Sequence, residues 1–272
     1  MPTTSRMGSS VISLGLGLGG GKAATSSGRL PSGGGGAWDG NQYAVQVDGT
    51  DDIISVGSVG DTYYDLGTND FSFSFWLKLD SLDASYFGVF GMSQSATGYN
   101  AYLARNGKFA FYNAPTLSSN LSSALALNQW YHVAYVRNSG TLQVFVNGTG
   151  GLTPSVGSLT FDSASSFRIG DDNNPSLPPI DGLIDECALW KNHALTTSEI
   201  SNLRGGASSG TLGLPADISS IGTDNSGNSG PDNWWRMGDN DGGTGTTVTD
   251  QGSGGKDGTL TNGATFSTTV PT

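Results

Sequence analysis

The sequence predicts an all-β sandwich with one short α-helix and a glycine-rich N-terminal arm. Three observations predict this fold class: apolar residues that alternate with polar ones, turn residues between the alternating runs, and 43 glycines among 272 residues without a collagen-like period. Alternation with a period of two gives a strand one core face and one mostly solvated face. Frequent glycine without a period is typical of turn-rich β architecture.

The clearest strand covers residues 71–79. Its core-facing positions are Phe71, Phe73, Phe75, Leu77 and Leu79, and between them lie Ser72, Ser74, Trp76 and Lys78. The same alternation recurs in 131–135 and 142–146, and we expect further strands at 169–170 and 183–190. Asn138-Ser139-Gly140 and Asn147-Gly148 follow these runs. Because Asn and Gly tolerate positive φ, they predict hairpin turns.

One segment has a different pattern. Thr196 and Glu199 have the spacing of a capping box, and Ile200 and Leu203 follow at helical spacing. This pattern predicts one short helix directly after the last strand of the main block.

Five segments of the main block, in their order along the chain, resemble the laminin-G-like, concanavalin A-like jelly-roll family. They are DGTDDIISVG, NDFSFSFWLKL, NQWYHVAYVRNSGTLQVFVNG, RIGDD and IDGLIDECALWKNHALTTSEISNL. The resemblance covers residues 48–204 well and 233–266 loosely. It implies a jelly-roll β-sandwich that serves as a binding or assembly module. Because this fold hosts many functions, the resemblance says little about the ligand.

The chain divides into an arm at 1–36, a sandwich at 37–204, a loop or linker at 205–232 and C-terminal strands at 233–272. The tail pattern W-x-M-x-D, which begins at Trp235, resembles the strands that usually open such a domain. The tail either supplies edge strands to the same sandwich or begins an incomplete second unit. The first alternative is favoured, because a lone hairpin is only marginally stable in water.

The arm contains Leu14, Leu16 and Leu18 in alternation with glycine. It is either a flexible linker or an extended peptide that adds a strand to the sheet edge of a neighbouring subunit. Its apolar part is short and half glycine, so we expect no cleaved signal peptide.

Charge and composition exclude several classes. A net charge of −11 argues against nucleic-acid binding through a basic face. No run approaches the roughly 20 apolar residues that span a membrane. The single cysteine, Cys187, rules out an intrachain disulfide and is expected to be a buried thiol.

Hydrolase chemistry is disfavoured. Some concanavalin-like relatives are glucanases, which need closely spaced acids on one strand. Their Glu-x-Asp-x-x-Glu type of strand is absent. Asp185 and Glu186 are adjacent, so in a regular strand they would point to opposite faces. His132 is expected to pack within the fold, and His193 to lie on the surface. We therefore expect no enzymatic activity.

A structural calcium ion is the candidate cofactor. Asp48, Asp51 and Asp52 lie on a tight turn, and calcium binds six to eight oxygens. The resemblance adds Asp185, because related jelly rolls often bind calcium between a late-strand aspartate and an early loop. The alternative is that Asp185 caps backbone amides and that the Asp48 turn is an Asx-turn.

Candidate ligand-binding residues are Tyr99 and Tyr102, which fall in or near predicted loops and edges, and Asp171 and Asn173 in an oxygen-rich loop. Exposed aromatic rings stack on sugars, and neighbouring polar groups bind hydroxyls. The alternatives are core tyrosines and a solvated turn.

Two functions remain. The first is a virion structural protein (capsid decoration, fibre or appendage) that forms a homo-oligomer, attaches to capsid or tail proteins through the arm and presents the sandwich outward to glycans. The second is a secreted bacterial carbohydrate-binding module or adhesin, which would be extracellular.

Overall fold

The computed structural model describes residues 40–94 and 97–272. Leu14, Leu16 and Leu18 of the expected arm lie outside the described residues, so the arm and its assembly role stay predictions.

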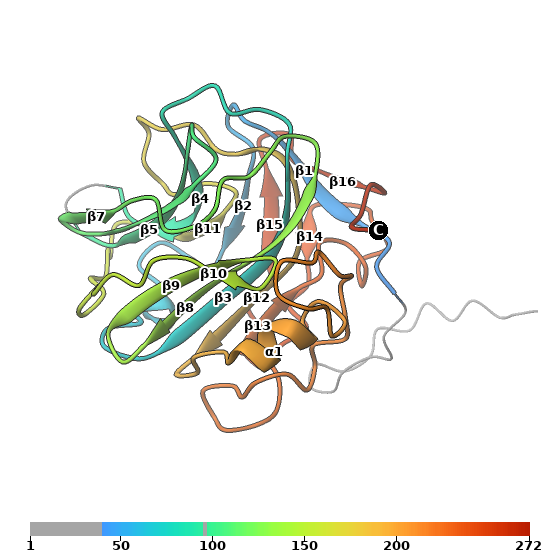
Figure 1. Ribbon diagram of the computed structural model, residues 1–272. Helices are drawn as coiled ribbons and strands as arrows, with labels where there is room; N and C mark the ends of the chain where they lie inside the picture. Colours follow the sequence, from blue (N-terminus) through green and yellow to red (C-terminus); the bar gives the residue numbers. More distant parts are fainter. Residues whose placement is uncertain (1–39, 95–96) are drawn as a thin grey trace, which may run out of the picture. The chain divides into compact units, whose positions relative to one another are not determined.

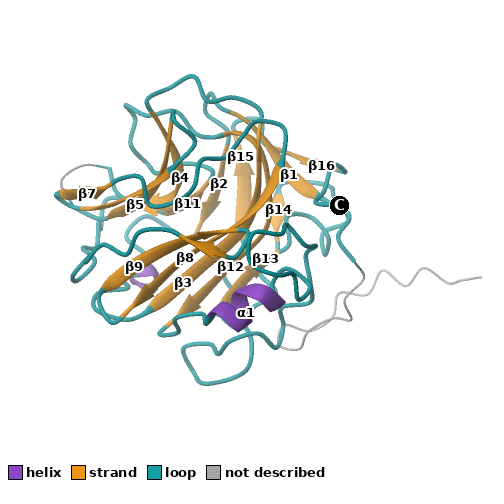
Figure 2. Cartoon of the chain, in the orientation of Figure 1, coloured by secondary structure: helices purple, strands orange, loops and turns teal. Residues whose placement is uncertain are grey.

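The described residues form two eight-stranded antiparallel sheets that pack face to face (Figures 1 and 2). Sheet A contains, in spatial order, β10 (Thr149–Gly150), β9 (Thr141–Val146), β8 (Trp130–Asn138), β3 (Phe71–Leu79), β12 (Asp181–Lys191), β1 (Ala44–Asp48) and β16 (Thr265–Ser267), with β13 (Asn233–Trp235) paired to β12. Sheet B contains β14 (Thr247–Val248), β15 (Gly258–Thr261), β2 (Ile53–Val56), β11 (Phe167–Ile169), β4 (Tyr86–Met92), β5 (Tyr99–Ala104), β6 (Phe109–Asn113) and β7 (Thr116–Ser118). The predicted fold class is confirmed.

The main core lies between the sheets and is rich in aromatic rings. Phe73 of β3 packs against Phe90 of β4 with ring centroids 4.2 Å apart, and Phe75 packs against the ring of Tyr135. Aromatic contacts of this kind stabilise a core beyond the apolar area that they bury. The alternation predicted for 71–79 therefore directs the expected side chains into the core.

The second face of β3 is not solvated, and that part of the prediction is wrong. Ser72, Ser74 and Trp76 are all buried. The reason is a second apolar cluster that covers the outer face of sheet A. It consists of Ala134, Val136, Phe145, Ala188, Trp190, Leu195, Ile200, Leu203, Ile218 and Trp234.

The predicted capping box is confirmed at helix α1 (Thr197–Asn202). The Glu199 backbone N–H donates to Thr196 Oγ1 over 3.2 Å, and the Thr196 N–H donates to Glu199 Oε2 over 2.7 Å. This reciprocal pair satisfies two of the donors that a helix start leaves open. Ile200 then lies in the outer cluster of sheet A. A short 3₁₀ helix, η1 (Thr62–Tyr64), precedes β3.

The C-terminal strands belong to both sheets. β13 pairs with β12 and β16 pairs with β1 in sheet A, whereas β15 pairs with β2 in sheet B. Trp235 lies in the core between the sheets, and Trp234 lies in the outer cluster. The tail thus closes the sandwich that the earlier strands begin. Within the described residues, no helix is long and apolar enough to cross a membrane.

Trp235 is fully buried, whereas Trp130 at the start of β8 is only half-buried. Trp235→Ala should therefore lower the free energy of unfolding by about 3–5 kcal/mol. Trp130→Ala should lower the free energy of unfolding by clearly less. Urea unfolding of both variants checks this, and equal costs would contradict a structural role for the tail.

Candidate functional site

A loop at residues 170–180 crosses the outer face of sheet B. The Gly88 backbone N–H of β4 donates to the Pro178 carbonyl over 3.0 Å. The Asn100 amide of β5 donates to Asp172 Oδ2 over 3.2 Å. A Cβ on Gly88 would lie 2.6 Å from the backbone nitrogen of Asp172, so only glycine allows this approach. The loop therefore divides the outer face into two parts.

The first part is a cavity of about 510 Å³ beside β2, β11 and β15. This volume lies in the range typical of small-molecule sites. The lining is mainly polar and consists of Thr50, Asp51, Gln94, Arg168, Asp171, Asn173, Asn174 and Asn262, together with Ile53, Leu177 and two prolines. Hydroxyl, amide and charged groups thus converge on one open space.

Two of these side chains keep hydrogen-bonding capacity. Arg168 Nη1 forms an ion pair with Asp171 Oδ2 at 2.6 Å, but Arg168 Nε has no partner. The Asn173 amide donates to the Ser166 carbonyl over 2.7 Å, which leaves Asn173 Oδ1 without a partner. Buried polar atoms without partners are uncommon, because leaving them unpaired is costly.

The second part is a row of tyrosines from three adjacent strands. Tyr86 of β4 and Tyr102 of β5 have ring centroids 5.9 Å apart, and Tyr102 and Tyr112 of β6 are 6.4 Å apart. Tyr102 is buried, whereas Tyr86 and Tyr112 are half-buried. The Asn100 amide donates to the Tyr102 hydroxyl over 3.0 Å, which fixes the middle ring.

The structure brings three of the four expected ligand residues to this face. Asp171 and Asn173 line the cavity, and Tyr102 lies in the tyrosine row. Tyr99 does not reach the face, because on β5 it alternates with Tyr102 and points into the core. Its hydroxyl donates to the Tyr64 carbonyl over 2.9 Å.

Sequence reasoning did not assign Arg168 or Asn262 of this face to the site. The outward direction of Arg168 on β11 follows from the period of two once the strand is known. Asn262 and Asp51 come from distant turns, and only the pairing of β15 with β2 brings them together.

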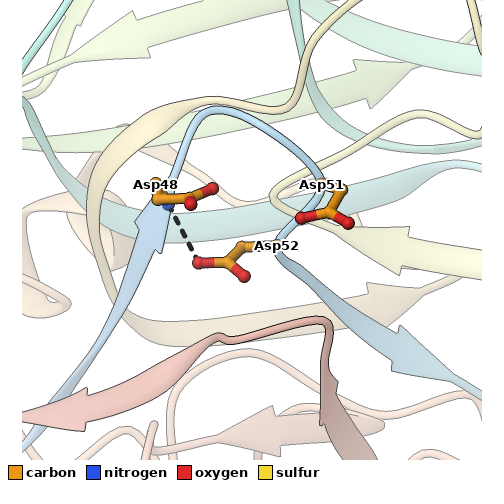
Figure 3. Close-up of side chains that lie close together, drawn as sticks. All are labelled: Asp48, Asp51 and Asp52. Atoms are coloured by element: carbon orange, nitrogen blue, oxygen red, sulfur yellow. Dashed lines mark hydrogen bonds between the residues drawn. The ribbon is translucent and has the colours of Figure 1, made fainter.

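The acidic turn between β1 and β2 borders the cavity through Asp51 (Figure 3). Asp48 and Asp51 are exposed, and Asp52 is buried. The Asp48 N–H donates to Asp52 Oδ2 over 3.1 Å, and the Thr50 N–H donates to Asp48 Oδ1 over 2.9 Å. One ligand atom from each carboxylate lies within 4.8 Å of the others.

These three carboxylates could together hold a metal ion. Calcium–oxygen distances are about 2.3–2.6 Å, so two oxygens 4.8 Å apart can both reach one ion. Asp52 Oδ1 is buried and has no hydrogen-bond partner. Asp48, Asp51 and Asp52 would hold the ion, and it would supply positive charge to an otherwise acidic turn.

Neighbouring acids increase this negative charge. In the ladder between β1 and β12, Asp48 lies opposite Asp181. Burial, Asp80 and Asp83 together raise the pKa of Asp181. Burial and the adjacent Asp48 likewise raise the pKa of Asp52. Like charges directly opposite each other destabilise a ladder, so a bound cation would relieve this repulsion.

The structure does not bring Asp185 to this turn. Asp185 lies four residues from Asp181 along β12, which is about 13 Å in a strand. Its Oδ1 accepts from the Glu186 N–H and its Oδ2 accepts from the Asn41 amide, both over 2.8 Å. These contacts agree with the alternative expected from the sequence, in which Asp185 caps amide groups.

The expectation that Asp185 and Glu186 point to opposite faces is wrong. The pairing of β12 with β3 shifts after Asp185, and Glu186 has φ +45°. This bulge inserts an extra residue, so that both carboxylates lie on the outer side of sheet A. Glu186 Oε1 accepts from Arg236 Nε over 3.1 Å, and Trp234 Nε1 donates to Oε2. Burial raises the pKa of Glu186 to about 7 although Arg236 opposes the shift.

The histidines are placed largely as expected. His132 is fully buried, and burial lowers its pKa to about 3. Its Nε2 lies 3.0 Å from Ser74 Oγ. His193 lies before α1, partly exposed, with its Nε2 3.0 Å from Glu199 Oε1. Cys187 is a buried free thiol.

The family model of the concanavalin A-like lectin/glucanase superfamily, laminin G type, matches residues 48–201, which is more than half of the chain. The chain belongs to this superfamily. The structure is also similar to that of a proposed carbohydrate binding protein from Bacteroides ovatus ATCC 8483. The TM-score is 0.57 at 20% identity, over 84% of this chain and 60% of that one.

A second similar structure is domain 4 of AbnA, a GH43 extracellular arabinanase from Geobacillus stearothermophilus, in complex with arabinotriose. Its TM-score is 0.47 at 22% identity, over 60% of this chain and 85% of that one. At 20% identity, the likeness to the Bacteroides ovatus protein shows the fold alone. The comparison with curated proteins gives no significant match.

Calcium should raise the melting temperature of the protein, and chelation should lower it, because an ion that binds only the folded state stabilises it by mass action. Asp51→Asn should reduce the response. Asp65→Asn, at an exposed acid directly after η1 and outside the turn, should keep the response. Thermal unfolding of each variant with calcium and with a chelator measures this response. If chelation left the melting temperature of the wild type unchanged, the acidic turn would be a simple Asx-turn.

Stability should also depend on Asp172. Burial raises its pKa from 3.8 to about 7, although hydrogen bonds from Tyr102 and the Asn174 N–H oppose the shift. The folded chain therefore holds this proton up to about pH 7, whereas the unfolded chain releases it near pH 4. The stabilising contribution is complete below about pH 4 and is lost as the pH rises through about 7.

In urea unfolding, the free energy of unfolding of Asp172→Asn should therefore decline less steeply than that of the wild type between about pH 4 and pH 7. Asp162→Asn is the opposite control. Burial of Asp162 is outweighed by hydrogen bonds from the Gln94 and Ala164 N–H groups and from Ser165, so the pKa is lowered. The contribution of Asp162 is lost as the pH falls. If the free energy of unfolding of Asp172→Asn fell with pH as steeply as that of the wild type, the raised pKa of Asp172 would be contradicted.

Proposed function

We propose that this protein is a carbohydrate-binding protein without catalytic activity, and that it binds a glycan on the outer face of sheet B. The observation that carries the proposal is the polar cavity of about 510 Å³ beside the 170–180 loop. The same open face also carries the row of tyrosine rings.

The composition of the cavity matches the chemistry of a sugar. A sugar hydroxyl both donates and accepts hydrogen bonds, and the amides of Gln94, Asn174 and Asn262 offer both roles. The carboxylates of Asp51 and Asp171 accept, and the guanidinium of Arg168 donates. Tyrosine rings nearby can stack on the apolar face of a pyranose.

The comparisons support the proposal at a coarser level. Membership of a lectin and glucanase superfamily is compatible with sugar binding, although this fold hosts many functions. The similar structure from Bacteroides ovatus is named for carbohydrate binding. Both favour the second of the two functions expected from the sequence, an exported carbohydrate-binding module or adhesin acting outside the cell.

The virion role stays a prediction. It depends on the arm at residues 1–36, which lies outside the described residues, and on capsid or tail partners. No comparison bears on either.

A bulky side chain at the cavity should block binding. Gln94 is exposed and lines the cavity, and Gln129 is an exposed glutamine before β8 of sheet A. Gln94→Trp should weaken glycan binding at least about tenfold, which is 1.4 kcal/mol. Gln129→Trp should leave it unchanged.

The measurement is a glycan array followed by affinity electrophoresis in gels that contain the bound polysaccharides. Thermal unfolding confirms that both variants fold. Failure of the wild-type chain to bind any glycan would refute the proposal. Equal binding by Gln94→Trp and the wild type would place the site elsewhere.

A further inference from the structure

We propose that the polar cavity beside the 170–180 loop selects glycans that carry a protonated amino group, and that the carboxylate of Asp51 receives this group. This inference rests on the proposed function and specifies the class of glycan. Amino sugars are thereby preferred over N-acetylated sugars, whose nitrogen is uncharged, and over acidic sugars.

Three charged side chains stand among the described residues that line the cavity, and two of them neutralise each other. Arg168 Nη1 lies 2.6 Å from Asp171 Oδ2. The same carboxylate oxygen accepts from the Asn173 backbone N–H over 3.3 Å. Because Arg168 already binds a carboxylate of the chain, it is a poor partner for an acidic sugar. The charge that remains in this lining is the negative charge of Asp51.

Asp51 is fixed through its backbone, whereas its carboxylate is available to a ligand (Figure 3). The amide of Asn262, in the turn after β15, donates to the Asp51 backbone carbonyl over 2.8 Å. The Asp51 side chain is exposed, and its carboxylate has no ion pair or hydrogen bond within residues 40–94 and 97–272. The cavity therefore presents a free anionic acceptor at its edge.

The surroundings of Asp51 strengthen the attraction for a cation. One ligand atom of its carboxylate lies within 4.8 Å of those of Asp48 and Asp52. Asp181 faces Asp48 across the ladder between β1 and β12. A cleft bordered by charges of one sign concentrates ligands of the opposite sign and repels those of the same sign. An ammonium group is therefore favoured here, and a sugar carboxylate is disfavoured.

An unpartnered acceptor within the lining points to a ligand rich in donors. Asn173 is only 4% exposed and lines the cavity, and its Oδ1 has no hydrogen-bond partner. A protonated amine has three N–H donors and no acceptor, as in lysine. An N-acetyl group has a single N–H and no charge, and a carboxylate has only acceptors. An amino sugar therefore brings the most donors to this lining.

The test compares two β-1,4-linked glucosamine hexamers, one fully deacetylated and one fully N-acetylated, so that length and linkage are matched. Isothermal titration calorimetry is run at mildly acidic pH, where the amines are protonated. A chelator keeps metal ions away from the acidic turn. The wild-type chain should bind the deacetylated hexamer at least about fivefold more tightly, the gain expected from one partly exposed charge pair. A galacturonic acid hexamer should bind most weakly.

Asp51→Asn should remove most of this preference. Asp65→Asn is the matched control, because Asp65 is exposed, lies directly after η1 and outside the cavity lining, and its replacement changes the net charge equally. Equal losses in both variants would mean attraction to the overall negative charge of the protein, and would overturn the inference. Equal or tighter binding of the N-acetylated or the acidic hexamer would overturn it as well.

Gln94→Trp distinguishes failure of this inference from failure of the proposed function. If both glucosamine hexamers bind equally and Gln94→Trp abolishes their binding, the inference fails and the proposed function survives. If neither hexamer binds, the inference also fails, and the proposed function then needs another glycan on the array that Gln94→Trp no longer binds. If the wild-type chain binds no glycan at all, both fail.

Discussion

The close approach of the 170–180 loop to β4 determines the shape of the candidate site. It depends on Gly88, because any side chain there would collide with the backbone of Asp172. The hydrogen bonds from Gly88 to Pro178 and from Asn100 to Asp172 then hold the loop against the sheet. The polar cavity lies on one side of the loop and the tyrosine row on the other. The raised pKa of Asp172 follows from the same burial.

The two sheets have different outer faces for a physical reason. The outer face of sheet A carries Trp190, Ile200 and Trp234, which the helix and the tail bury as a second apolar cluster. The outer face of sheet B carries Ser55, Tyr86, Tyr112 and Arg168, which are only half-buried and remain partly in water. A polyhydroxylated ligand therefore has a suitable surface on sheet B.

Negative charge is concentrated at one end of the site. The acidic turn at Asp48, Asp51 and Asp52 lies beside Asp181, and Asp51 also lines the cavity. Asp48 and Asp51 are exposed, so salt screens their repulsion, whereas Asp52 is buried. The buried carboxylates of Asp185 and Glu186 are different, because amide, indole and guanidinium donors bind them directly.

The sequence by itself determined the strands of the main block, the capped helix and the acidic turn. Each depends on neighbours in the chain: alternation in 71–79, the pairing of Thr196 with Glu199, and three aspartates within five residues. Tertiary structure decided the rest. The bulge at Glu186, the burial of Tyr99 and the meeting of Asp51 with Asn262 depend on sheet register and on which face is covered. Those features arise from contacts between distant segments, and local periodicity does not encode them.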